Sequence, residues 1–140
     1  LEKNEVRCVR RVDGQKFQVK VDELKNKIPE ELEAVQKAMF TKAKEERDSR
    51  LKEAHNWTEF MQHLNSSCLI LTPWCGKSDL EADVKKKSAA DSKEDPNAGS
   101  LTGAAKTLCI PKNQEPIKEG EKCFFTGEPA KYRVLWGRSY

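Results

Sequence analysis

A long helical pattern divides this chain into two parts. Between about Val21 and Ala54, apolar residues recur at three- and four-residue spacing, at Leu32, Val35, Met39 and Ala43. The stripe is narrow, and the second half of the segment (TKAKEERDSRLKEA) is almost entirely charged. A helix with so little apolar surface cannot be buried on all sides. It is either a solvated helix that extends beyond its core contact or a rigid connector between two domains, and we favour a connector over residues 22–55.

The segment before this helix predicts a β-hairpin over residues 1–21. The stretches VRCVRRV and QKFQVK flank Asp13-Gly14, a strong two-residue turn signal. Two strands alone are only marginally stable in water, so this hairpin needs a larger sheet. We expect that sheet upstream of Leu1, because the chain begins without a methionine and has the character of a fragment of a longer protein.

The segment after the helix predicts a small α/β domain over residues 56–140. Asn56 and Glu59 have the spacing of a helix-capping pair. The short runs CLILT, TLCIP, KCFF and AKYRVLW predict strands, because they are continuously apolar or alternate with polar residues. Residues near 88–105 lack aromatic side chains and predict a flexible loop. The expected architecture is therefore α/β, with a long connecting helix followed by a small mixed sheet with flanking helices.

The composition narrows the class of protein without identifying a partner. Charged residues make up 35% of the 140 residues, and the net charge is +3. This mildly basic balance permits a nucleic-acid partner but does not argue for one. No apolar run approaches the roughly 20 residues that a membrane span needs. The five widely spaced cysteines, in a chain without a recognisable signal peptide, favour reduced thiols and a cytoplasmic location.

The residues alone do not predict a complete active site. The sequence has no glycine-rich phosphate-binding loop, and no pair of carboxylates stands out from the general charge. No Ser-His-Asp or Cys-His set has a recognisable local signature, although a set assembled in space stays open. The chain is therefore not expected to be an enzyme by itself.

Three short motifs carry a resemblance to a known family. AKYRVLWGRSY at the C-terminus, TLCIP before it and TPWCG earlier still resemble the C-terminal domain of eukaryotic/archaeal-type prolyl-tRNA synthetases. The resemblance continues upstream, since VRRVDGQKF resembles the last hairpin of that family's anticodon-binding domain and AVQKAMFTKAKE resembles the helix that follows it. It therefore spans nearly the whole chain in the family's order.

The resemblance implies a function that this chain would share only as part of a larger ligase. Prolyl-tRNA synthetases are class II aminoacyl-tRNA synthetases of protein biosynthesis, which use ATP and magnesium to activate proline and join it to proline tRNA. The catalytic core and most of the anticodon-binding domain would precede Leu1, so the fragment would hold no catalytic residue and be inactive alone. The family also implies a homodimer for the intact enzyme. The alternative is a non-catalytic structural or protein-interaction module.

The resemblance also implies roles for particular residues. In relatives the C-terminal tyrosine is placed toward the active site, so Tyr140 would face that site, with residues 137–139 as its approach. A structural role, in which Tyr140 packs against a neighbouring domain, stays open. The hairpin would lie beside the anticodon reader, so Arg10 and Arg11 are candidate tRNA contacts, although paired arginines on a strand are more often solvated or ion-paired.

The family's zinc positions are degenerate in this sequence. Relatives often bind zinc through two cysteine pairs, and these map to Cys75 and Leu80 and to Cys123 and Phe125. Structural zinc sites are almost always four-coordinate, so two thiolates cannot hold the metal tightly. We expect no zinc, but an apolar plug of Leu80 and Phe125, with Cys75 and Cys123 close together. A site completed by Cys109 or by water is the alternative.

Overall fold

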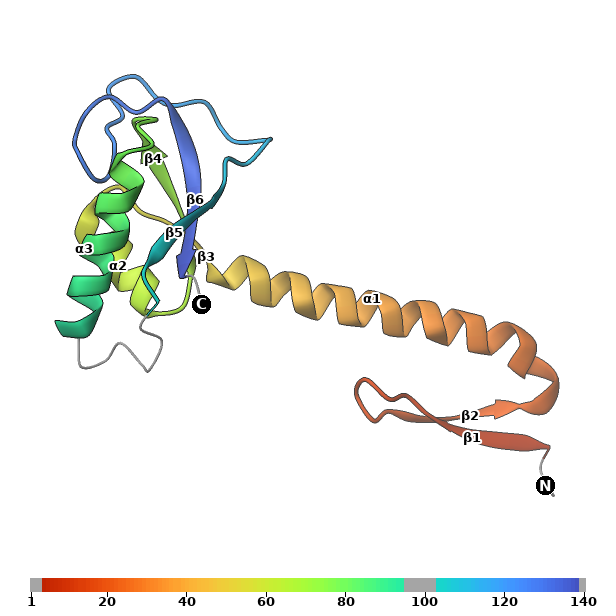
Figure 1. The fold of residues 1–140 in the computed structure, drawn as a ribbon. Coiled ribbons are helices and arrows are strands. Elements are labelled where there is room, and N and C mark those ends of the chain that lie inside the picture. Colours follow the sequence, from red (N-terminus) through yellow and green to blue (C-terminus); the bar gives the residue numbers. More distant parts are fainter. Residues whose placement is uncertain (1–3, 95–102, 139–140) are drawn as a thin grey trace. The chain divides into compact units, whose positions relative to one another are not determined.

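The computed structural model describes residues 4–94 and 103–138, which form two compact units. The first unit ends at Asp48 and the second begins at Ser49. The predicted α/β class is confirmed, with a long helix, a small mixed sheet and flanking helices (Figure 1). Within the described ranges, no helix is both long enough and apolar enough to cross a membrane.

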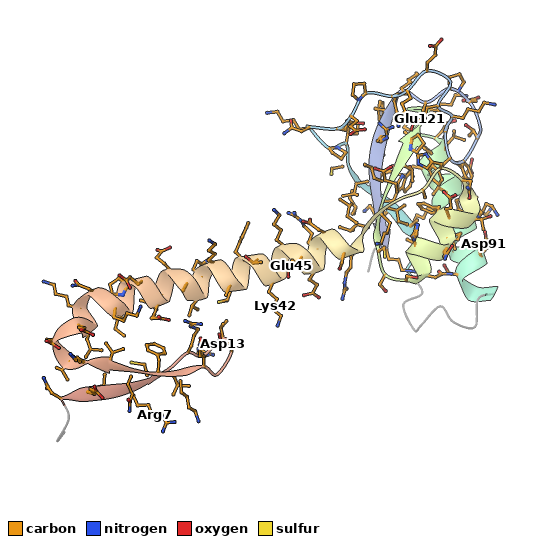
Figure 2. All side chains as sticks on the ribbon, turned by 180° about the vertical axis from the view of Figure 1, so that it is seen from behind. Arg7, Asp13, Lys42, Glu45, Asp91 and Glu121 are labelled. Atoms are coloured by element: carbon orange, nitrogen blue, oxygen red, sulfur yellow. The ribbon has the colours of Figure 1, made fainter. Side chains whose placement is uncertain are left out.

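The first unit combines a hairpin with a long helix. Its elements are β1 (Glu5–Val9), β2 (Lys16–Lys20), the 3₁₀ turn η1 (Val21–Glu23) and α1 (Leu24–Arg50). The two strands are antiparallel, with Val6 opposite Val19 and Cys8 opposite Phe17. Figures 1 and 2 both show the hairpin folded back along the first half of α1. The hairpin and the helix predicted from the sequence are therefore both present.

The hairpin loop is longer than the two-residue turn that Asp13-Gly14 predicts. The strand pairing ends at Val9 and Lys16, so residues 10–15 connect the strands. Gly14 has a φ angle of 71°, a region that favours glycine, and its N–H donates to the carbonyl of Arg10 at 2.8 Å. The Asp13 carboxylate accepts the N–H two residues on, at 2.9 Å. Asp13-Gly14 therefore correctly marks the position of the hairpin loop, but the predicted two-residue turn is wrong.

The apolar stripe of α1 is open to solvent. Leu32 and Met39 are 63% and 53% exposed, and no described residue of the helix is buried. In the hairpin, Val19 is buried. This unit therefore presents apolar surface, as expected of a hairpin and helix that need a larger sheet. That upstream sheet stays a prediction.

The second unit is a four-stranded mixed sheet with its helices on one side (Figure 1). Its elements are β3 (Leu51–Glu53), α2 (Trp57–Asn65), β4 (Leu69–Trp74), α3 (Leu80–Glu94), β5 (Ala105–Cys109) and β6 (Tyr132–Arg138). The strand order is β3-β4-β6-β5, where β3 runs parallel to β4 and the other pairs are antiparallel. This order brings the C-terminal strand to the middle of the sheet.

Two segments differ from the elements that the sequence predicts. The helical pattern expected to reach Ala54 ends at Arg50, because Leu51–Glu53 pair with β4 as a strand. The run KCFF is not a strand, and in it Lys122 forms only an isolated bridge. Residue 123 instead closes a tight turn through backbone hydrogen bonds with Gly127 and residue 128. The apolar run is therefore a buried turn whose phenylalanines enter the core.

The loop predicted near residues 88–105 is shorter than its composition indicates. Helix α3 continues to Glu94, so residues 88–94 are helical, and β5 begins at Ala105. Ser88 is fully buried, and its hydroxyl accepts the N–H of Ala105 at 2.9 Å. This contact holds the second half of α3 against β5. The remainder of the predicted loop, residues 95–102, lies outside the described residues.

Helix α3 also covers the outer edge of β5. Besides the bond to Ser88, the N–H of Thr107 donates to the Glu81 carboxylate at 3.3 Å. An edge strand normally exposes such unpaired N–H groups, which can recruit another strand. Side chains of α3 therefore close the edge that β5 would otherwise present.

Aromatic side chains fill the space between the sheet and the two helices. Phe60, Trp74, Phe124 and Trp136 are buried, and the ring centroids of Phe60 and Phe124 are 4.7 Å apart. The Trp136 indole N–H donates to the buried Thr72 hydroxyl at 3.0 Å. Each buried side chain of this size contributes about 1.5–3 kcal/mol to stability. This cluster is the core of the second unit.

The capping pair predicted at the start of α2 is confirmed. The Asn56 side chain accepts the N–H of Glu59 at 3.0 Å. The Glu59 carboxylate reaches back to the N–H of His55, at 2.9 Å. The hydrogen bond from the His55 N–H and, after it, one from the Asn56 side chain to the same carboxylate hold the pKa of Glu59 below its usual value. The cap fixes where α2 begins and hence where Phe60 enters the core.

Candidate functional site

The motifs TPWCG, TLCIP and AKYRVLW come together at one end of the second unit's sheet. Trp74 on β4 lies opposite Tyr132 on β6, and β5 pairs with the other side of β6. A groove of about 230 Å³ is lined by residues of all three motifs, among them Trp74, Gly76, Thr107 and Tyr132. Segments far apart in the sequence therefore share one site.

The glycine of TPWCG is required by this arrangement. Gly76 has a φ angle of 82°, where larger residues are strained. A Cβ atom at this position would lie 3.3 Å from the Tyr132 hydroxyl and 3.2 Å from Cδ of Lys131. The N–H of Lys131 in turn donates to the Trp74 carbonyl at 2.8 Å. Gly76 thus lets β6 approach the end of β4.

The chemistry of the groove is structural. Its carboxylate, Glu81, accepts both the backbone N–H and the hydroxyl of Thr107. The other residues lining the groove are mostly apolar or carry a hydroxyl or thiol. Among the described residues, this groove does not assemble the acid, base and nucleophile that a reaction would need.

All four positions mapped to the family's zinc site lie in or against the aromatic core. Cys75 and Cys123 are free, buried cysteines, each 3% exposed. Leu80 and Phe125 are partly buried and pack against the core cluster. The Phe125 ring lies 5.3 Å from the Trp57 ring, measured between centroids. The packing of Leu80 and Phe125 is that of apolar core residues.

The sulfur of Cys123 is surrounded by hydrogen-bond donors. Burial raises the pKa of this thiol, but donors from Thr126, Phe125 and the backbone of Cys75 outweigh burial and leave the pKa below its usual value. The expected proximity of Cys75 and Cys123 agrees with this contact. Within residues 4–94 and 103–138, no group of three or more His, Cys, Asp or Glu side chains could hold a metal ion. Two thiols and two apolar side chains do not fit a tetrahedral zinc site.

Arg138, the arginine of the GRSY motif, is anchored inside the unit. Its Nε donates to the Leu64 carbonyl at 3.1 Å and its Nη1 to the Gly103 carbonyl at 2.9 Å. Its Nη2 donates to the side chain of Asn65. These bonds join the end of β6 to the end of α2 and to Gly103, which lies two residues before β5. Arg138 is therefore anchored as the last described residue of β6, and Ser139 and Tyr140 lie outside the described residues.

Sequence reasoning missed a buried ion pair on the opposite side of β6. Nη2 of Arg133 donates to both carboxylate oxygens of Glu121, at 2.7 and 2.8 Å, and both side chains are nearly inaccessible to solvent. Nη1 donates to the Glu115 carbonyl at 2.7 Å. The Gln114 side chain accepts the backbone N–H of Arg133 at 2.6 Å. These bonds hold residues 111–121 against the sheet. In the sequence, the only signal for the ion pair is the presence of an arginine, Arg133, within an otherwise apolar strand pattern.

The two candidate tRNA contacts in the hairpin differ in their surroundings. Arg10 bonds to Glu31 of α1 at 2.6 Å and to Asp13 at 3.1 Å. The bonds to Glu31 and Asp13 raise the pKa of Arg10, and the bond from Arg10 lowers the pKa of Glu31. Arg11 is exposed. Arg7 is also exposed and lies on the face of β1 away from α1 (Figure 2). Arg10 therefore joins the hairpin to the helix, whereas Arg7 and Arg11 are exposed to solvent.

Comparison with known sequences decides the family. The family described as prolyl-tRNA synthetase, C-terminal, matches residues 57–140, which are most of the second unit. The chain belongs to this family. The resemblance carried by TPWCG, TLCIP and AKYRVLWGRSY is thereby confirmed.

Individual prolyl-tRNA synthetases match over nearly the whole chain. The cytoplasmic proline–tRNA ligase of Arabidopsis thaliana is 41% identical over 140 residues, covering 100% of this chain and 24% of that protein. A putative proline–tRNA ligase of Saccharomyces cerevisiae is 41% identical over 145 residues, covering 100% of this chain and 21% of that protein. The bifunctional glutamate/proline–tRNA ligase of Drosophila melanogaster is 36% identical over 137 residues, covering 95% and 8%. The chain thus spans about a quarter or less of these relatives.

The buried ion pair of this synthetase domain yields a prediction. Replacing Glu121 with Gln leaves Arg133 buried without a counter-charge and should lower the free energy of unfolding by about 3 kcal/mol. Urea unfolding followed by tryptophan fluorescence measures this directly, because Trp57, Trp74 and Trp136 all lie in the second unit.

The matched control is Glu128→Gln, which removes the ion pair of Glu128 with Lys77. Both of those side chains are about half exposed, so the free energy of unfolding should hardly change. Equal effects of the two substitutions would contradict a structural role for the Arg133 pair.

Proposed function

We propose that this chain is the C-terminal part of a class II prolyl-tRNA synthetase, which uses ATP to join proline to proline tRNA. The observation that carries the proposal is the family match to residues 57–140, together with relatives that are named proline–tRNA ligases. In this proposal the domain assists the catalytic core without itself catalysing the reaction. The meeting of the three family motifs at one end of a small sheet supports this role. The fragment alone should be inactive, because catalysis would belong to residues outside it.

The C-terminus is proposed to act on the active site of the whole enzyme. Arg138 is anchored by three groups in the second unit, which sets the starting point for the residues that follow. In this proposal Tyr140 faces the active site and contributes its aromatic ring and terminal carboxylate there. The role is one of positioning, since no catalytic residue is assigned within this chain.

The hairpin is proposed to contact proline tRNA. Arg11 is exposed and can reach a phosphate, whereas Arg10 acts indirectly by bonding the loop to Glu31 of α1. Arg7, on the outer face of β1, can add a second phosphate contact. The proposed partners are therefore proline tRNA, the upstream catalytic and anticodon-binding domains, and a second copy of the intact enzyme as a homodimer.

The proposed cofactors belong to the whole enzyme. ATP and magnesium would bind in the catalytic core, and the residues of this chain are assigned no contact with them. The cytoplasm is the proposed location, in keeping with the name of the Arabidopsis relative. Zinc is proposed to be absent, because Leu80 and Phe125 provide packing in place of two of the four ligands.

The experiment that tests the function is proline charging. The complete polypeptide that carries this chain should charge proline tRNA in the presence of ATP, and the 140-residue chain alone should not. Deleting Tyr140 from the complete polypeptide should lower turnover about tenfold or more, equivalent to about 1.4 kcal/mol in the barrier.

The control is Tyr140→Phe, which keeps the ring and the terminal carboxylate and should retain most of the turnover. All forms must melt alike for the comparison to count. Unchanged turnover after the deletion would leave Tyr140 with a structural role only. A complete polypeptide that fails to charge proline would refute the proposed function.

A second prediction concerns metal content. The chain purified without added metal should contain far less than one zinc per molecule by elemental analysis, because two thiolates do not complete a closed site. The double substitution Leu80→Cys with Phe125→Cys restores four cysteines and should raise zinc retention. Stoichiometric zinc in the unsubstituted chain would overturn the apolar plug.

A further inference from the structure

Two buried thiols of the second unit have no part in the proposed function. Cys75 directly follows β4, Cys123 lies in the turn before β6, and each is 3% exposed. Both cysteines are free. The backbone N–H of Cys75 donates to the sulfur of Cys123. Because the sulfur of a cysteine lies only one short side chain away from its own nitrogen, this contact brings the two thiols together.

Two further contacts hold the segments that carry these cysteines against each other. The Phe124 N–H donates to the Pro73 carbonyl at 3.1 Å. On the other side of the first cysteine, the Lys77 ammonium donates to the Glu128 carboxylate at 2.7 Å. These contacts lie before and after the first cysteine in the sequence, and both lead to the turn that carries the second. The fold therefore keeps the two thiols next to each other.

The turn around the second cysteine is fixed by its own hydrogen bonds. The Cys123 N–H donates to the Glu128 carbonyl at 2.7 Å, and the Gly127 N–H donates to the Cys123 carbonyl at 3.0 Å. Donors from Thr126 and Phe125 also reach the sulfur of Cys123. Such donors stabilise a thiolate, which is the nucleophilic form of a cysteine. We therefore assign Cys123 as the attacking sulfur in the reaction below.

The pair has no further metal ligand beside it in the described part of the chain. Leu80 and Phe125 pack against the core to which both cysteines belong. Within residues 4–94 and 103–138, no third His, Cys, Asp or Glu side chain joins the two thiols in a group that could hold a metal ion. Two adjacent thiols without further ligands have the chemistry of a dithiol, which a two-electron oxidant converts into a disulfide.

The pair lies just below the surface. Gly76 is half-buried, and Lys77, Thr126 and Gly127, which closely follow the two cysteines in the sequence, are exposed. A small oxidant such as hydrogen peroxide can therefore reach the sulfurs through a local opening of these turns. Because each cysteine is nearly inaccessible, the thiol of a second protein molecule has poorer access than the neighbouring thiol.

We propose that Cys75 and Cys123 are a redox pair, which hydrogen peroxide converts into a disulfide within the chain and a dithiol reductant restores. The Cys123 thiolate attacks one peroxide oxygen, the O–O bond breaks, and hydroxide leaves a sulfenic acid on the sulfur. The Cys75 thiolate then attacks this sulfur, so that the S–S bond forms and the S–O bond breaks with loss of a second hydroxide. The two thiol protons convert the hydroxides into water, and two electrons pass from the sulfurs to the peroxide.

The disulfide would link the end of β4 to the turn before β6. The family motifs meet at this end of the sheet, so the redox state of the pair sets how firmly that end is held. A cross-link between residues far apart in the sequence restricts the unfolded chain more than the folded one, so oxidation should stabilise the second unit. This inference does not depend on the proposed function.

The test uses a variant of the 140-residue chain that keeps only the buried pair. Its substitutions are Cys8→Ser, Cys68→Ser and Cys109→Ser, and none of these three cysteines is buried. The folded variant is treated with hydrogen peroxide in the presence of a metal chelator, its free thiols are alkylated, and its peptides are analysed by mass spectrometry. The complete polypeptide that carries this chain is treated in the same way.

The expected product in both proteins is a pair of peptides joined by a disulfide between Cys75 and Cys123. Oxidation should raise the melting temperature of the variant by at least about 5 °C, and dithiothreitol should return it to its starting value. The matched control adds Cys123→Ser to the variant and should show no rise, which also accounts for oxidation of the exposed Met39. Identification of the linked peptides does not depend on this control.

Three outcomes would overturn the proposal. Two free thiols at a peroxide dose that fully oxidises Met39 would show that the pair is not a peroxide-sensitive dithiol. Sulfinic acid at Cys123 without linked peptides would show that the Cys75 sulfur does not reach it. A linked product that melts below the reduced variant would show that the disulfide does not fit the fold. Proline charging plays no part in these measurements, so the redox pair and the proposed function stand or fall separately.

Discussion

Phe124 is the contact on which the second unit depends. Its ring lies between those of α2, β4 and β6, with centroids 4.7 Å from Phe60, 5.7 Å from Trp136, 6.0 Å from Trp74 and 6.3 Å from Trp57. Phe124 belongs to a turn, and its N–H donates to the Pro73 carbonyl at 3.1 Å. Phe124 therefore joins the turn before β6 to α2, β4 and β6. It lies at the end of the sheet where the family motifs meet.

The aromatic cluster also gives the proposed absence of zinc a physical basis. Cys75 and Cys123 stay buried at the same end of the sheet, and Leu80 and Phe125 add apolar surface to the core. Full burial of a large apolar side chain contributes about 1.5–3 kcal/mol, so these two partly buried residues supply a fraction of the roughly 10–16 kcal/mol of a structural zinc. The hydrogen bonds of Arg138 to Leu64, Gly103 and Asn65 then anchor the last described residue of β6.

Local sequence patterns predicted most helices and strands of the fold. They did not predict contacts between residues that are far apart in the sequence. The α1 helix, the Asn56 cap and the strand over residues 132–138 follow from periodicity and capping chemistry. The failures share a cause, since β3 exists because of β4 and the run at 122–125 turns because its phenylalanines have a core to enter. The roles of Arg133 and Arg138 depend in the same way on partners far away in the sequence. Of the candidate site, the sequence predicted the motifs, and packing set their geometry.

The most direct test of this account is the urea unfolding of Phe124→Ala, followed by tryptophan fluorescence. Because Phe124 is 5% exposed and central to the cluster, the substitution should lower the free energy of unfolding by about 3–5 kcal/mol. Phe40→Ala is the matched control, since Phe40 is 64% exposed on α1 and its loss should change stability by no more than about 0.5 kcal/mol. A loss below about 1 kcal/mol for Phe124→Ala would show that the second unit is held together by something other than its aromatic core.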